Sequence, residues 1–225
     1  MTDQQQQVRL GRLADRVFEA VIFDLDGTLI DSTPAVLRSW ATWTREHGLR
    51  PEDHAGHHGL PSASVVRALL PADRHDAAIA RINELEIADV SDIVVLPGAI
   101  EALEALRDAR NAIATSCDLR LAKARIAAAK LEPPSVLVTA DDVTRGKPAP
   151  DPFLEAARRL QVDPANCLVV EDSPMGLQAA RAAGCATLAV ITTTPADELI
   201  ADAVVGTLAD VRFEVTPDGI RVREA

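Results

Sequence analysis

The chain has 225 residues, 48% of them hydrophobic and 25% charged, which is enough apolar material for a buried core. Its formal net charge of -11 opposes binding to nucleic acid and to anionic membranes, so we expect neither as a partner. Three cysteines without metal-binding or redox spacing, and an N-terminal stretch without an apolar signal segment, indicate a cytoplasmic protein without disulfides.

The first strong pattern is an apolar run followed by two acidic residues. Residues 20–23 have the composition of a buried parallel strand, and Gly27 lets the chain turn sharply after it. One residue separates Asp24 from Asp26, so a continuing strand would point both carboxylates to the same face of the sheet. Two such anions repel unless a cation or a proton lies between them. The pair could serve a divalent metal, a nucleophile beside a general acid, or only a solvated acidic turn.

The following segment shows helical patterns only. Val36, Leu37, Trp40 and Trp43 recur at helical spacing, and no strand pattern is visible from residue 32 to residue 91. This predicts an all-helical insertion that leaves the main domain after its first strand. The predicted division of the chain is an N-terminal extension (1–18), a core in two pieces (19–31 and 97–225) and a helical cap (32–96).

Some residues of the cap could contact a ligand. Trp40 lies on the same predicted helix as Trp43, and packing in a helical core is the commoner role for such a pair. His54, His57 and His58 have a spacing that could bind a metal, but a polar loop that touches the substrate through His58 fits the pattern better. We therefore keep Trp40 and His58 as candidate substrate contacts.

From residue 97 the pattern alternates between helix and strand. Short apolar strands are expected at residues 112–115, 135–139, 167–170 and 187–191, with helices at 99–109, 118–130, 151–160 and 173–184. Asp118 and Asp151 are the expected N-caps of two of these helices. Repeated units of this length predict an α/β fold with a Rossmann-like parallel sheet, covered on both faces. Residues 211–223 have the pattern of a C-terminal hairpin.

Polar residues gather at the expected carboxyl ends of these strands. They are Asp24 and Asp26, Thr115 and Ser116, Lys147, and Glu171 and Asp172. In such sheets the chemistry lies at this edge. Four carboxylates and one lysine sum to a charge of -3, which would repel a phosphate dianion. One Mg²⁺ and one proton bring that sum to zero, so the residues predict a magnesium site that handles phosphate.

The chain resembles the haloacid dehalogenase superfamily. The resemblance rests on four motifs in order, which are Asp-Leu-Asp-Gly-Thr (24–28), Thr-Ser (115–116), Gly-Lys-Pro (146–148) and Glu-Asp-Ser-Pro (171–174), and it spans residues 20–215. Within the superfamily the chain is most similar to bacterial sugar phosphatases and glycerol-phosphate phosphatases, through residues 140–152 and the terminal hairpin. The helical insertion corresponds to the small cap that closes over the substrate in that family.

The resemblance implies a role for each site residue. Asp24 would attack phosphorus to form an aspartyl-phosphate, and Asp26 would protonate the leaving alcohol and then activate water. Thr115 and Lys147 would hold the transferring phosphoryl group, with Ser116 as a helper. The implied Mg²⁺ ligands are an Asp24 carboxylate oxygen, the Asp26 backbone carbonyl, Asp172, and Glu171 through water.

Alternative functions stay open. A phosphomutase of the β-phosphoglucomutase type would pass the phosphoryl group to a second hydroxyl, but those relatives carry an arginine shortly after the cap glycine, whereas Leu-Pro-Ser (60–62) follows Gly59 here. Signalling receiver domains share the aspartates and lysine but lack a cap, and a long-lived switch has no use for Asp26. We expect a phosphatase that acts on a small phosphorylated sugar or polyol, with phosphoglycolate as another possible substrate. We also favour a monomer.

Overall fold

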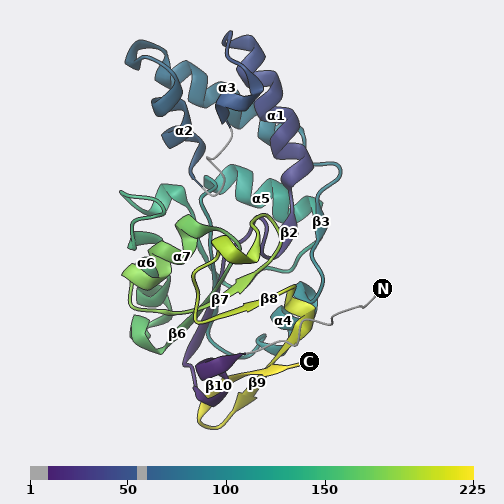
Figure 1. Cartoon of the computed structure of the whole chain (residues 1–225), viewed down its shortest axis with the longest axis vertical. Helices are drawn as coiled ribbons and strands as arrows, with labels where there is room; N and C mark the ends of the chain where they lie inside the picture. The colour runs from purple at the N-terminus through teal and green to yellow at the C-terminus, as the bar shows by residue number, and fades with distance from the viewer. Residues whose placement is uncertain (1–9, 55–59) are drawn as a thin grey trace.

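The computed structural model describes residues 10–54 and 60–225 of the chain, and it consists of an α/β core with a helical cap at one end (Figure 1). The core holds a six-stranded sheet with the order β5-β4-β1-β6-β7-β8, in which every neighbouring pair is parallel. Its strands are β1 (Ala20–Phe23), β4 (Asn111–Ala114), β5 (Val136–Val138), β6 (Cys167–Glu171), β7 (Ala186–Val190) and β8 (Ala203–Val205). The predicted fold class is therefore confirmed.

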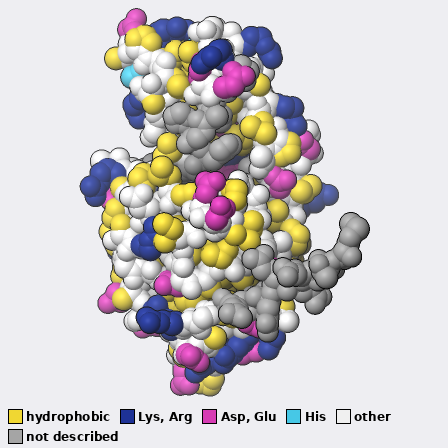
Figure 2. All heavy atoms as spheres, in the orientation of Figure 1, with side chains coloured by type: hydrophobic (Ala, Val, Ile, Leu, Met, Phe, Trp, Pro, Cys, Tyr) yellow, Lys and Arg dark blue, Asp and Glu magenta, His cyan; other side chains and the backbone are white. Residues whose placement is uncertain are grey.

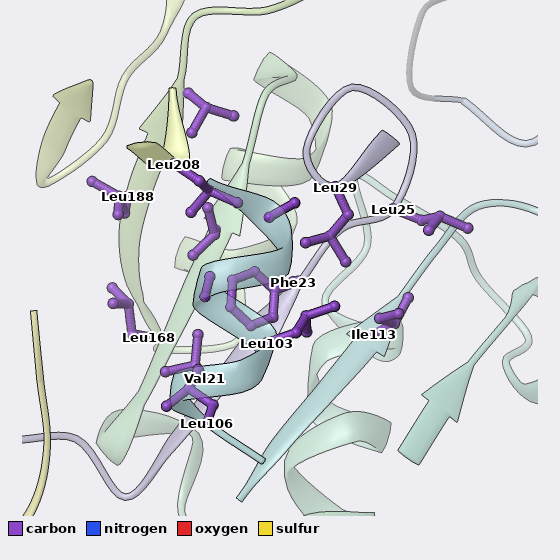
Figure 3. Packing of buried hydrophobic residues seen from close by; sticks show 14 of the residues in the cluster. Val21, Phe23, Leu25, Leu29, Leu103, Leu106, Ile113, Leu168, Leu188 and Leu208 are labelled. Carbon is purple, nitrogen blue, oxygen red and sulfur yellow. The ribbon is translucent and has the colours of Figure 1, made fainter. Parts of the chain in front are cut away.

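Helices cover the sheet on both faces because side chains alternate along each buried strand. Val21 and Phe23 of β1 join the core cluster under α4 (Ala99–Ala105) and α5 (Leu119–Ala128). Figure 3 shows these two residues beside Leu103 and Leu106 at the end of α4. Ala20 and Ile22 point the other way, into the cluster under α6 (Asp151–Leu160) and α7 (Pro174–Ala182).

The structure corrects the sequence prediction at one strand of the sheet and at one helix cap. Strand β8 was not expected, because three residues are too few for a readable alternating pattern. Asp151 is the first residue of α6 and not its N-cap, a position that Pro150 occupies. The side chain of Asp151 instead pairs with Arg145 at 2.8 Å. The other predicted cap is confirmed, since Asp118 accepts a hydrogen bond from the backbone N–H of Leu121.

The cap is built from α1 (Thr33–Glu46), α2 (Ser62–Leu69) and α3 (His75–Ala88), which pack around their own apolar cluster. Trp43 is fully buried there, and its indole N–H donates to the carbonyl of Ala78 at 2.8 Å. The chain enters the cap through β2 (Ile30–Asp31) and returns through β3 (Val94–Val95). These strands pair with each other in antiparallel fashion, so both crossings between core and cap lie side by side.

The two ends of the described chain pack on the core. Strands β9 (Val211–Thr216) and β10 (Gly219–Glu224) form the predicted hairpin, and Phe213 meets the ring of Phe23 edge-on at 5.9 Å. Phe18 is fully buried and bridges to Ile220 of β10. The short 3₁₀ helices are η1 (Gly11–Asp15), η2 (Pro51–His54), η3 (Ala72–Arg74), η4 (Ala140–Asp142), η5 (Pro164–Asn166), η6 (Ala196–Glu198) and η7 (Leu208–Asp210).

On the face shown in Figure 2, acidic and basic side chains are interspersed over both core and cap. Among the described residues, no helix combines the length and the apolarity that crossing a membrane requires.

Candidate active site

A cavity of about 440 Å³ lies between the carboxyl edge of the sheet and the cap. Its walls come from the ends of β1, β4 and β6, from the loop before α6, and from all three cap helices. All seven core residues predicted as site residues line it, which are Asp24, Asp26, Thr115, Ser116, Lys147, Glu171 and Asp172. The sheet topology brings them together, because β4 and β6 are the two neighbours of β1.

Lys147 links two of the carboxylates. Its Nζ donates to Asp24 Oδ1 at 2.5 Å and to Glu171 Oε1 at 2.7 Å, and the lysine is only 3% exposed. Burial by itself lowers the pKa of Lys147, but the two carboxylates outweigh burial and raise it above the usual value. Burial also raises the pKa of Asp24 to about 7, against the opposing effect of Lys147. The lysine is thus held as a cation between two buried carboxyl groups.

Glu171 is held by the start of α7. Its Oε2 accepts hydrogen bonds from the backbone N–H groups of Asp172 and Ser173 and from the Ser173 hydroxyl, at 2.7–2.9 Å. Ser173 is the N-cap of α7, and its hydroxyl oxygen accepts from the backbone N–H of Gly176. Gly176 lets the helix come this close, since a Cβ there would lie 1.6 Å from Glu171 Oε1.

Asp24, Glu171 and Asp172 could hold a metal ion. Each is buried, and one carboxylate oxygen from each lies within 4.8 Å of the others. Burial raises the pKa of Asp172 well above its ordinary value, and the neighbouring Glu171 and Asp24 charges raise it further. A hard divalent cation would relieve this repulsion, and three carboxylates are the donor type that Mg²⁺ prefers. The residues present therefore fit the predicted metal.

Two hydroxyl groups orient Asp172 on the side of the β1 loop. Thr28 donates to its Oδ1 at 3.4 Å, and Thr193 donates to its Oδ2. Gly27, with φ of 88°, allows the loop to approach, because a Cβ there would lie 2.3 Å from Asp172 Oδ2.

Asp26 lies at the border between the core and the cap. Its Oδ1 accepts from Ser32 Oγ at 2.6 Å and lies 2.9 Å from Arg125 Nη1. Its Oδ2 lies 3.1 Å from Cys117 Sγ. Burial raises the pKa of the Cys117 thiol well above its ordinary value, and Asp26 raises it further, so this residue is a thiol that donates to the carboxylate.

The remaining predicted residues occupy the rim and the roof. Thr115 is buried, and its hydroxyl accepts from the backbone N–H of Cys117 at 3.1 Å, next to Ser116. Trp40 lines the cavity and also meets Trp43 at 5.1 Å in the cap core, so it can serve packing and ligand contact together. His57 and His58 lie outside the described residues.

Sequence reasoning missed Arg125, Glu86 and Thr193, all of which line the cavity. A signal for Arg125 did exist. It lies one turn after Leu121 on the helix face that α5 buries, and an arginine on such a face needs partners. No pattern could have identified Glu86, because α3 carries acidic residues on several sides.

Comparisons with known proteins bear on this site. The sequence model of the haloacid dehalogenase-like hydrolases matches residues 18–184. Hexitol phosphatase A of Escherichia coli (strain K12) is 44% identical over 183 residues, which cover 78% of this chain and 83% of that protein. Glycerol-1-phosphate phosphohydrolase 1 of Saccharomyces cerevisiae is 33% identical, with coverage of 80% and 77%. A solved structure from Thermotoga maritima, described as a proposed β-phosphoglucomutase, has a TM-score of 0.65 at 30% identity, with coverage of 85% and 95%.

Proposed function

The chain belongs to the haloacid dehalogenase-like hydrolase family and is a phosphatase, as the sequence predicted, and we propose that it removes phosphate from a sugar or polyol by way of an aspartyl-phosphate on Asp24. The observation that carries this proposal is the buried contact of Asp24 with Lys147 at the base of the cavity. It combines an oxygen nucleophile with a cation that can receive the phosphoryl charge.

In the first step Asp24 attacks phosphorus, and the bond to the leaving oxygen breaks. Lys147, held in place by Glu171, neutralises the phosphoryl oxygens during the attack. Thr115 and Ser116 lie at the end of β4 on the same wall, where a hydroxyl and a backbone N–H can add hydrogen bonds.

Asp26 acts in both steps. In its protonated form it gives the proton to the leaving alcohol and becomes a carboxylate. In the second step this carboxylate takes a proton from water, whose oxygen bonds to phosphorus while the bond between phosphorus and Asp24 breaks. Its position at the border with the cap suits this role, because the leaving group must lie in the part of the cavity that the cap covers. The predicted cap, residues 32–96, would exclude bulk water from this space.

We assign Mg²⁺ to the acidic cluster. Its ligands would be a carboxylate oxygen of Asp24, the backbone carbonyl of Asp26 and the carboxylate of Asp172. Both oxygens of Glu171 already accept hydrogen bonds, so its contribution would pass through water. The ion would supply positive charge that lets a phosphate dianion enter an acidic site.

The side chains that line the cavity from the cap and the rim support a sugar or polyol phosphate as the substrate. They include the neutral polar residues Ser62, Ser64, Asn83 and Thr144, beside apolar residues such as Val36, Leu60 and Ile79 and the cation Arg67. The neutral polar groups exchange hydrogen bonds with hydroxyls, which suits a sugar or polyol phosphate. The hexitol and glycerol phosphate relatives support the same class.

A mutase of the β-phosphoglucomutase type is the second candidate, supported by the similarity to the Thermotoga maritima structure. It would use the same Asp24 and Asp26, but it would return the phosphoryl group to the sugar in place of water.

The test is phosphate release from a panel of hexitol, sugar, glycerol and glycolate phosphates, with Mg²⁺ or EDTA, for the wild type and Asp24→Asn. We expect release that needs Mg²⁺ and is lost in the variant, with polyol or sugar phosphates preferred. Interconversion of sugar phosphates without net release of phosphate would show that the protein is a mutase and not a phosphatase. Full activity of Asp24→Asn would refute the proposal that Asp24 is the nucleophile.

A further inference from the structure

A buried arginine joins the proposed acid, Asp26, to the cap. Arg125 of α5 is 4% exposed, and its Nη1 lies 2.9 Å from Asp26 Oδ1 in the core. Its Nη2 lies 3.1 Å from Oε1 of Glu86, which belongs to cap helix α3 and is also 4% exposed. Glu86 Oε2 in turn accepts a hydrogen bond from Ser62 Oγ of α2 at 3.1 Å. The chain of contacts thus runs from the catalytic loop through one guanidinium group to two cap helices.

We propose that Arg125 is a positioning residue for Asp26, and that its ion pair with Glu86 makes the placement of Asp26 depend on the cap. This inference rests on the proposed role of Asp26 as general acid and base. Among the contacts of the described residues, Arg125 touches neither Asp24 nor Asp172, and it meets Asp26 through the carboxylate and not through the backbone carbonyl assigned to the metal.

The first argument concerns the orientation of Asp26. Among the described residues, its Oδ1 receives both strong donors, Ser32 and Arg125, whereas the partner of Oδ2 is the thiol of Cys117. A thiol is a weak donor, so Oδ2 is the oxygen left for proton transfer to the leaving group. Without Arg125, a single hydroxyl would hold Oδ1, and the carboxylate could rotate about its bond to the backbone.

The second argument concerns charge. A guanidinium group with so little exposure is stable only when carboxylates compensate it. Among the described residues, Arg125 pairs with the carboxylate of Asp26 in the core and with that of Glu86 in the cap, and its Nη1 also lies 3.2 Å from Cys117 Sγ. Burial raises the pKa of Glu86 despite the opposing charge of Arg125, which means that this carboxylate is costly to bury. If the cap moves away from the core, Arg125 loses its contact with Glu86. The guanidinium group can then turn toward water, and Asp26 loses the donor that holds its Oδ1.

A positioning role for Arg125 can be distinguished from a structural role by comparing two kinds of leaving group. A misplaced acid slows departure of an alkoxide, which needs a proton, but hardly slows departure of p-nitrophenolate, which does not. The value of kcat/KM reports the step up to the phosphorylation of Asp24, so it isolates the acid role from the later activation of water.

The experiment compares kcat/KM for glycerol 1-phosphate and for p-nitrophenyl phosphate in Arg125→Met, Arg125→Lys, Glu86→Gln and Asp26→Asn. General acids contribute roughly 10²- to 10⁴-fold, so we expect Arg125→Met to lose about 100-fold on the alkyl ester and under about 5-fold on the aryl ester. Arg125→Lys keeps the positive charge but not the planar guanidinium group with its several donors. It should therefore retain part of the kcat/KM on the alkyl ester that Arg125→Met loses. Glu86→Gln leaves the contact between Arg125 and Asp26 in place, so it should show the same selectivity with a smaller loss on the alkyl ester.

Arg120 provides the matched control. It lies on the same helix but is exposed, and it does not line the cavity, so Arg120→Met should match the wild type on both esters. If Arg125→Met lowers kcat/KM equally on both esters, Arg125 has only a structural role. If it lowers kcat/KM on neither ester, Arg125 has no role in the reaction. If Arg125→Met does not fold, Arg125→Lys and Glu86→Gln decide the question by the same ratio.

Asp26→Asn separates this inference from the proposed function. A selective alkyl loss in Asp26→Asn without one in the Arg125 variants overturns only the inference. If Asp26→Asn is not selective, the acid role itself is wrong and the inference fails with it.

Discussion

Gly176 offers a sharp test of how the site is held together. A glycine inside a helix normally costs about 0.8–1 kcal/mol relative to alanine, so Gly176→Ala would stabilise an ordinary helix by that amount. Here the added Cβ would lie 1.6 Å from Oε1 and 1.9 Å from the carboxyl carbon of Glu171. The glutamate is buried and has no room beside the helix, so it must leave its place.

The cost follows from the contacts that Glu171 would lose. It accepts hydrogen bonds from Lys147, from two backbone N–H groups and from the Ser173 hydroxyl. Hydrogen bonds to a charged group contribute about 1.5–3 kcal/mol each, so losing two of them destabilises the protein by about 3–6 kcal/mol, which exceeds the gain in helix propensity. Phosphate release should also fall strongly, because Lys147 would lose one of its two carboxylate partners.

Urea denaturation measures this change in the free energy of unfolding, with Gly184→Ala as the control. Gly184 follows the same helix with φ of 87°, and no other atom of residues 10–54 and 60–225, apart from its chain neighbours, lies within 4 Å of its added Cβ. Its substitution should cost only about 1–2 kcal/mol from the left-handed backbone, with activity retained. A Gly176→Ala protein as stable as the wild type would refute the close packing of α7 against Glu171.

Two further predictions concern the metal and the core. Burial raises the pKa of Asp24 from 3.8 to about 7, so below that pH the folded, metal-free protein keeps a proton that Mg²⁺ must displace. Mg²⁺ should therefore raise Tm more at about pH 8 than at about pH 6. A rise in Tm that is independent of pH, or one that Asp24→Asn retains, would contradict the assignment of Asp24 as a Mg²⁺ ligand. Phe213→Ala should lower stability by about 3–5 kcal/mol through loss of its contact with Phe23, while kcat of the folded enzyme stays unchanged. Val215→Ala, at an exposed position of the same strand, should change neither quantity.

The sequence predicted those parts of the molecule that a local pattern encodes. The run 20–23 is apolar throughout because β1 is central in the sheet, with β4 and β6 as its neighbours, and both of its faces are buried. The polar residues after β1, β4 and β6 could be grouped into one site before the structure was known, because parallel strands end at a common edge.

The features that stayed hidden depend on contacts between distant segments. The pairing of β2 with β3 involves only two residues on each side, so it leaves no readable period. Glu86 meets Arg125 across 39 positions of sequence, and only the placement of the cap on the core brings them together. Likewise Thr193 reaches Asp172 from the loop after β7, where nothing in its neighbourhood distinguishes it from Thr192 or Thr194.

The most direct test of the aspartyl-phosphate on Asp24 is a rapid-mixing measurement on Asp26→Asn with p-nitrophenyl phosphate. The aryl group leaves without a proton, but hydrolysis of the intermediate lacks its base, so the intermediate should accumulate. The account predicts a burst of one p-nitrophenol per chain, with the phosphoryl group on Asp24, and no burst in the Asp24→Asn, Asp26→Asn double variant. A single slow phase without a burst, or a burst that survives loss of Asp24, would contradict it.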